Sequence, residues 1–162
     1  MRILIVEDSL PVARIIEQYV SPIASEVVIA TDMQTAMEEL SKVPPIGLVT
    51  LDLNLPDSGV EDTIKQIQEI KRLKPDCLLV IITGMVSHDQ EKVVLEAGAD
   101  GLMHKTTTIG HGRETFLGTL RDIAKSIMRV PRRYTKNIDL LEHLADKIAQ
   151  YFTQPNPATK PT

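Results

Sequence analysis

The chain has 162 residues, of which 43% are hydrophobic and 25% charged, so it has a globular composition and is long enough for one ordinary domain. Its net charge of −4 and its 3% content of aromatic residues argue against direct nucleic-acid binding through a basic, base-stacking surface. The single cysteine, Cys77, excludes an internal disulfide, and no apolar run approaches the length of a membrane span. We therefore expect a cytoplasmic protein without a membrane segment.

Short apolar runs rich in Val and Ile recur along the chain, at residues 3–6, 27–30, 46–51 and 77–82. Continuous runs of this length, bounded by turn residues, are typical of parallel strands that are covered on both faces. A fifth run, at 101–104, is short and contains no β-branched residue, so it is a weaker strand candidate.

Amphipathic segments alternate with these runs. Ser9 and Pro11 are placed to begin a helix after the first run, Thr31 or Asp32 to cap the next, and Ser87 to begin a fourth. The residues that we expect to face inward are Val12, Ile15, Ile16 and Tyr19; Ala36, Met37 and Leu40; Val60, Ile64, Ile67 and Ile70; Val93, Val94 and Ala97; and Phe116, Leu117, Leu120, Ile123, Ala124 and Ile127.

The alternation of strand and helix, repeated five times over residues 1–130, predicts an α/β domain. Its sheet would be parallel and doubly wound, with right-handed crossovers and helices on both faces.

Residues 131–162 form a C-terminal extension outside this repeat. Asn137 is placed to cap a helix over about 138–152, whose apolar stripe would be Leu141, Leu144, Ala145, Ile148 and Phe152. Such a stripe needs a partner surface, either this domain or another chain. The last residues, from 154, contain three prolines and are expected to form a tail or linker.

Polar residues stand at the ends of the apolar runs, where an open parallel sheet binds its ligands. They are Glu7, Asp8, Asp52, Thr83 and Lys105. Each alone is commonly a helix cap or a solvated strand end, but together they would place three carboxylates on one edge. Two carboxylates about 5 Å apart repel by about 3 kcal/mol at an effective dielectric of about 20. Mg²⁺ prefers oxygen ligands and would offset this repulsion, and an Asp beside Mg²⁺ and Lys is a competent nucleophile for phosphoryl transfer.

Four motifs stand at these positions: Ile3-Leu-Ile-Val-Glu-Asp-Ser9, Leu51-Asp52-Leu-Asn-Leu-Pro-Asp-Ser-Gly59, Ile81-Ile-Thr-Gly84, and Glu96-Ala-Gly-Ala-Asp-Gly101 leading to Lys105. Together they resemble the receiver domain of two-component response regulators, over residues 1 to about 128. The resemblance implies a flavodoxin-like (βα)5 fold with the strand order 2-1-3-4-5, to which the C-terminal helix is an addition.

The resemblance also implies how the site works. Asp52 would take a phosphoryl group from a phosphohistidine on a sensor histidine kinase or a phosphotransfer protein. The implied catalytic residues are Asp52, Thr83 and Lys105, and the implied ligands of Mg²⁺ are Glu7, Asp8, Asp52 and the backbone carbonyl of Asn54. Phosphorylation would switch the affinity for a downstream protein target that the sequence does not identify, and homodimer formation stays open. Such a domain catalyses only its own phosphorylation and slow self-dephosphorylation.

Two positions depart from the family pattern. Thr106 follows the lysine where the family has a cis proline, and a cis bond before any other residue costs roughly 3 kcal/mol, so a trans bond is expected. Leu102 stands where the family has an aromatic switch residue. An alternative is therefore a receiver-like interaction module with weakened or absent switching. A haloacid-dehalogenase-like phosphatase is a further alternative, but its second acid would stand at Asn54.

Overall fold

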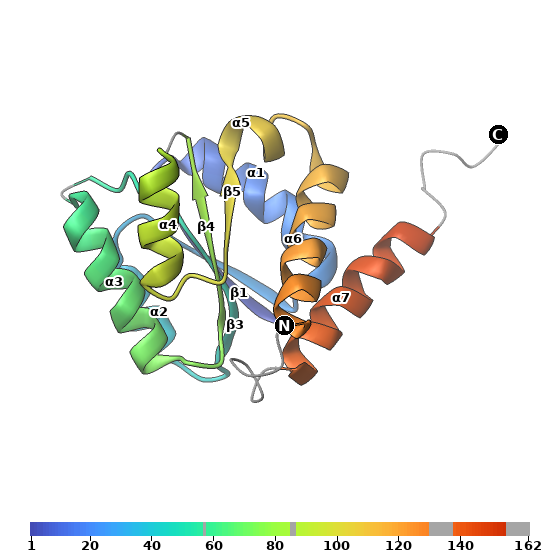
Figure 1. Ribbon diagram of the computed structural model, residues 1–162. Helices are drawn as coiled ribbons and strands as arrows, with labels where there is room; N and C mark the ends of the chain where they lie inside the picture. The colour runs from blue at the N-terminus through green and yellow to red at the C-terminus, as the bar shows by residue number, and fades with distance from the viewer. Residues whose placement is uncertain (57, 85–86, 130–137, 155–162) are drawn as a thin grey trace.

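The computed structural model describes residues 1–56, 58–84, 87–129 and 138–154. At its centre is a five-stranded parallel sheet with the order β2-β1-β3-β4-β5 (Figure 1). This confirms the predicted doubly wound α/β fold and its order 2-1-3-4-5. The strands are β1 (Arg2–Val6), β2 (Glu26–Ala30), β3 (Ile46–Leu51), β4 (Leu78–Thr83) and β5 (Gly101–His104).

Helices cover both faces of the sheet (Figure 1). They are α1 (Leu10–Val20), α2 (Met33–Leu40), α3 (Val60–Leu73), α4 (His88–Glu96), α5 (Lys105–Thr108), α6 (Arg113–Met128) and α7 (Ile138–Thr153), with a 3-10 turn η1 (Ser21–Ile23) after α1. Successive residues of a strand point to opposite faces. Ile3 and Ile5 therefore pack under α1, α6 and α7, whereas Leu4 and Val6 pack under α2, α3 and α4. Because both faces are covered, the central strands are continuous apolar runs.

The helix starts follow the capping residues of the sequence. Asp32 Oδ1 accepts from the Thr35 backbone N–H at 2.7 Å, and Ser87 Oγ accepts from the Gln90 N–H at 3.2 Å. Ser9 occupies the N-cap position of α1, but its hydroxyl makes no capping bond. This residue's backbone N–H donates instead to the Glu7 carboxylate, so the start of α1 is tied to an acidic side chain that we discuss below.

Three side chains that were expected to face inward are substantially exposed: Ile15 at 36%, Val93 at 40% and Phe152 at 41%. Helix α4 lies over the edge strand β5. Of its predicted inward residues Val93 and Val94, it buries only Val94, so its apolar face is narrower than predicted. Phe152 lies at the end of α7, beside the guanidinium of Arg121 on α6.

The predicted extra C-terminal helix is present as α7, and its partner surface is this domain itself. It packs antiparallel beside α6 (Figure 1) and buries Leu141, Leu144, Ala145 and Ile148. At its start, Leu140 lies so close to β3 that a Cβ at Gly47 would stand 3.2 Å from it. Residues 130–137, which contain the predicted domain boundary, and most of the predicted proline-rich tail lie outside the described residues. No helix in the described ranges has the length and apolar character to cross a membrane.

Candidate functional site

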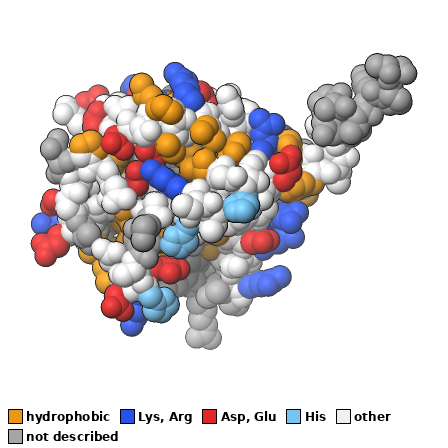
Figure 2. Space-filling model, turned by 90° about the horizontal axis from the view of Figure 1, so that it is seen from above, with side chains coloured by type: hydrophobic (Ala, Val, Ile, Leu, Met, Phe, Trp, Pro, Cys, Tyr) orange, Lys and Arg blue, Asp and Glu red, His pale blue; other side chains and the backbone are white. Residues whose placement is uncertain are grey.

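The acidic residues lie at the carboxyl edge of the sheet, where β1 and β3 end side by side. The ladder continues one residue beyond each strand, since the Asp52 N–H donates to the Val6 carbonyl and the Glu7 N–H to the Ala30 carbonyl, both at 3.0 Å. These bonds fix the backbone from which each acidic side chain projects. Figure 2 looks onto this end of the molecule, where acidic and basic side chains lie next to one another near the middle of the face.

Glu7, Asp8 and Asp52 form one acidic cluster. Each offers a carboxylate oxygen, and these three oxygens all lie within 4.8 Å of one another. Glu7 and Asp52 are buried, with 1% and 3% of their surface exposed, whereas Asp8 is exposed. Hard oxygen donors at this spacing, two of them shielded from water, fit a divalent cation such as Mg²⁺.

Lys105 reaches into this cluster from the end of β5. Its Nζ lies 2.7 Å from Glu7 Oε2 and 2.7 Å from Asp52 Oδ2, so one ammonium bridges the two buried carboxylates. Three carboxylates and one ammonium leave a net charge of −2, which a divalent cation would neutralise.

The protonation of two of these groups is shifted. Burial raises the pKa of the Glu7 carboxyl above its ordinary value, and the hydrogen bond from Lys105 offsets only part of that effect. Burial by itself would lower the pKa of the Lys105 ammonium, but the hydrogen bonds to Asp52 and Glu7 outweigh it, so this pKa is raised. The lysine therefore stays charged at neutral pH and holds the two carboxylates together.

Asn54 connects the acidic cluster to Thr83. Its backbone N–H donates to Asp52 Oδ1 at 3.1 Å, and its side-chain Nδ2 lies 3.5 Å from Thr83 Oγ1. Sequence reasoning singled out Asn54 only for its backbone carbonyl and missed the side-chain contact, because a contact between residues 29 apart has no local signal. Thr83 is fully buried at the end of β4 and pairs in register with His104 of β5.

The segment after Lys105 is a short helix, which the sequence did not predict. The Lys105–Thr106 bond is trans, as expected, and Lys105 is the first residue of α5. The buried Thr108 donates its hydroxyl to the His104 carbonyl at 2.6 Å, and Tyr19 of α1 donates to the Ile109 carbonyl at 2.8 Å. Although the stretch is polar, its hydroxyls are used to hold the turn together.

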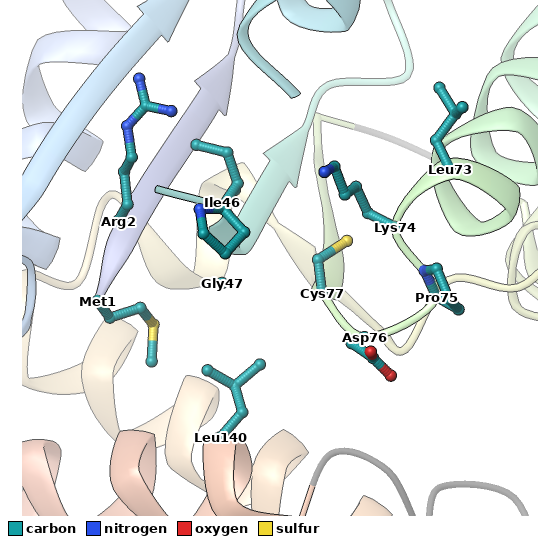
Figure 3. A pocket seen from close by; sticks show the side chains of 11 residues that line it. Met1, Arg2, Ile46, Gly47, Leu73, Lys74, Pro75, Asp76, Cys77 and Leu140 are labelled. Carbon is teal, nitrogen blue, oxygen red and sulfur yellow. The ribbon is translucent and has the colours of Figure 1, made fainter. Parts of the chain in front are cut away.

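A pocket of about 490 Å³ lies at the opposite edge of the sheet (Figure 3). Met1, Gly47, Cys77 and Leu140 line it, together with the end of α3. It lies at the amino ends of β1, β3 and β4, away from every candidate site residue, so it is not part of the acidic site.

Known proteins similar to this chain include a domain family and a curated relative. The model of the response regulator receiver domain family matches residues 3–116. The cell cycle transcriptional regulator CtrA of Caulobacter vibrioides is 30% identical over 105 residues, which cover 65% of this chain but only 44% of CtrA.

Solved structures share the fold. The chemotaxis protein CheY4 of Vibrio cholerae aligns with a TM-score of 0.63 at 19% identity, covering 75% of this chain and 97% of CheY4. A CheY-like receiver domain protein of Methanospirillum hungatei aligns with a TM-score of 0.61 at 24% identity, covering 77% and 97% of the two chains.

Proposed function

The chain belongs to the response regulator receiver domain family, and on this premise we propose that it accepts a phosphoryl group on Asp52 and thereby switches protein–protein interactions. A receiver domain is a signalling module rather than a true enzyme, and receiver domains interact with histidine kinases. The observation that carries the proposal is the bridging of Asp52 and Glu7 by Lys105 beside the exposed carboxylate of Asp8. The proposed phosphodonor is a sensor histidine kinase or a phosphotransfer protein, the proposed setting is the cytoplasm, and the readout is an unidentified protein partner.

The proposed transfer is a displacement at phosphorus. A carboxylate oxygen of Asp52 forms the new O–P bond, while the P–N bond to the donor imidazole breaks and leaves its electron pair on the nitrogen, which takes up a proton. The Asn54 N–H on Oδ1 and the Lys105 ammonium on Oδ2 orient the carboxylate for this attack. Little other covalent chemistry is required, because positioning and charge neutralisation supply most of the catalysis.

Glu7, Asp8, Asp52 and the Asn54 carbonyl are the proposed ligands of Mg²⁺. The bound ion would supply positive charge beside the phosphoryl oxygens. Lys105, already charged and 2.7 Å from Asp52, is placed to contact one of these oxygens after transfer. Thr83, whose hydroxyl lies beside the Asn54 side-chain amide, is proposed to donate a hydrogen bond to another phosphoryl oxygen.

Intact-mass measurement with acetyl phosphate and Mg²⁺ tests the proposal. We expect the wild type to gain the mass of one phosphoryl group and Asp52→Asn to gain none. Asp76→Asn is the matched control, since Asp76 is an exposed carboxylate at the opposite edge of the sheet. An unmodified wild type, or a phosphoryl group retained in Asp52→Asn, contradicts the proposal.

A second candidate function is a receiver-like interaction module that does not switch. It is favoured by Leu102, a half-buried aliphatic side chain where the family has an aromatic ring. Scattering and spectra with and without beryllofluoride separate the two candidates. An unchanged conformation and unchanged partner binding in the loaded protein would support the module.

We propose the domain bounds and the absence of nucleic-acid contact on the same basis. Residues 1–130 would form the receiver unit and residues 131–162 an extension of it, with no direct nucleic-acid contact by this chain. Homodimer formation stays open and is measured by the same scattering experiment.

A further inference from the structure

The last turn of α7 rests on the first nine residues of α6, Arg113 to Arg121, through a small group of polar and aromatic contacts, which we call the α6–α7 cluster. It consists of Arg113, Glu114 and Arg121 on α6 and of Tyr151 and Phe152 on α7. The Tyr151 hydroxyl donates to Glu114 Oε1 at 3.2 Å. The guanidinium carbon of Arg113 lies 6.0 Å from the centre of the Tyr151 ring, and that of Arg121 lies 5.3 Å from the Phe152 ring. The Tyr151 and Phe152 rings pack edge to face, with their centres 5.5 Å apart.

This cluster holds α7 differently from the rest of the helix. Leu141, Leu144 and Ile148 are at most 2% exposed and belong to the main core, so the first three turns of α7 are anchored by apolar burial. The last turn is anchored less firmly, because Tyr151 is only half-buried against this core and Phe152 is 41% exposed. Its cation–π contacts and single hydrogen bonds are individually weak. The buried Nε atoms of Arg113 and Arg121 also lack a hydrogen-bond acceptor among the described residues. A displacement of α6 can therefore loosen the last turn at a smaller cost than the first three turns, whose side chains are fully buried.

The α6 end of the cluster is connected to the acidic site by a short and ordered path. Lys105, which bridges Asp52 and Glu7, is itself the first residue of α5. The Ile109 and Gly110 N–H groups both donate to the Lys105 carbonyl, at 3.0 and 3.4 Å, so the backbone of the turn is tied to the backbone of the lysine.

The connector then enters α6 directly. The Gly112 N–H reaches the Ile109 carbonyl at 3.5 Å, and Gly112 carries the positive φ of +91° that starts α6 one residue before Arg113. Only seven residues separate Lys105 from Arg113. The path from the lysine backbone to the first turn of α6 is therefore short.

We propose that α7 is the output element of this receiver: a phosphoryl group on Asp52 moves Lys105, and α5 and the first turn of α6 pass this movement to the α6–α7 cluster. The proposal rests on the proposed function. A phosphoryl group adds about two negative charges and draws the ammonium away from Glu7. The shift of α5 separates Glu114 from Tyr151, and the last turn of α7 loosens.

Hydrogen exchange measured by mass spectrometry tests this, with Mg²⁺ alone and with Mg²⁺ plus beryllofluoride. We expect the amides of residues 149–153 to exchange about fivefold faster in the loaded protein, the change expected for the loss of one ordinary hydrogen bond. The amides around Leu141 and Leu144 serve as an internal reference and should not change. Equal exchange at 149–153 in the two states overturns the proposal.

Two variants of the same helical turn complete the test. Tyr151→Phe keeps the ring but loses the bond to Glu114, so residues 149–153 should exchange fast without beryllofluoride and respond little to it. Thr153→Ala removes a hydroxyl that donates to the Gln150 carbonyl within α7 and, among the described residues, to no atom of α6, so it should respond as the wild type does. A full response in Tyr151→Phe overturns the proposal. Both variants should still take up a phosphoryl group from acetyl phosphate by intact mass, and a wild type that takes up none refutes the proposed function and this inference with it.

Discussion

Replacing Lys105 by Met removes the only side-chain ammonium that the described structure places between Glu7 and Asp52, while keeping most of the aliphatic stem. The two carboxylates are at most 3% exposed, so they cannot recover hydration where they stand. Metal-free Lys105→Met should therefore be less stable than the metal-free wild type.

The size of the loss follows from the geometry. Carboxylate oxygens no more than 4.8 Å apart repel by about 3 kcal/mol at an effective dielectric of about 20. Removing one partner of a buried ion pair costs about 3–5 kcal/mol, and the 22% exposure of Lys105 favours the lower end of that range. A loss of about 3 kcal/mol corresponds to a Tm lower by roughly 6–12 °C in a domain of this size.

Thermal and urea unfolding in EDTA, followed by circular dichroism, measure this difference. Added Mg²⁺ should raise the Tm of Lys105→Met more than that of the wild type, because in the wild type the ion competes with the ammonium for the same carboxylates. Lys92→Met is the control, since Lys92 and Glu96 form an exposed pair at 3.8 Å that contributes little.

The loss should also depend on pH. Burial raises the pKa of Glu7 in the folded protein above its value in the unfolded chain. The folded state therefore binds the Glu7 proton more tightly, and the free energy of unfolding falls as the pH rises through the folded-state pKa. Without the lysine this pKa rises further, so the variant should lose more at about pH 8 than at about pH 5. A variant as stable as the wild type in EDTA at neutral pH, or one whose Tm does not respond to Mg²⁺, would refute the electrostatic reasoning.

Three further predictions concern the packing. In Gly101→Ala, the new Cβ would stand 2.7 Å from Cγ2 of Ile123, so urea unfolding should show a loss of about 1–3 kcal/mol, and unchanged stability would contradict the close packing of β5 on α6. Gly118→Ala in the middle of α6 meets open space and should add about 0.5–1 kcal/mol through helix propensity, whereas a decrease would show an unseen clash. Burial raises the pKa of the Cys77 thiol to about 11, so at about pH 8 roughly one thiol in a thousand is ionised and a disulfide reagent should modify the protein only as fast as it unfolds. Rapid modification of the folded protein would contradict this, and urea-unfolded protein is the control.

Much of the fold could be read from local pattern. The runs around Ile3 and Ile81 are apolar at every position because both sheet faces are covered, and that condition is visible in a few consecutive residues. The four motifs also placed Asp52 and Lys105 at strand ends correctly, since the carboxyl ends of parallel strands share one edge. Asp32 and Ser87 capped their helices as expected, because a cap is a contact between residues three apart.

Contacts between distant segments were decided by the tertiary structure. That Lys105 bridges Glu7 and Asp52 depends on the register and twist of three strands, and that Asn54 reaches Thr83 depends on the loop after β3. The sequence showed that the stripe of α7 needed a partner but left open which one, and the answer came from the apolar surface that α6 and η1 present together. Local periodicity shows which face of an element is apolar, whereas the surface that covers it depends on how all the elements pack at once.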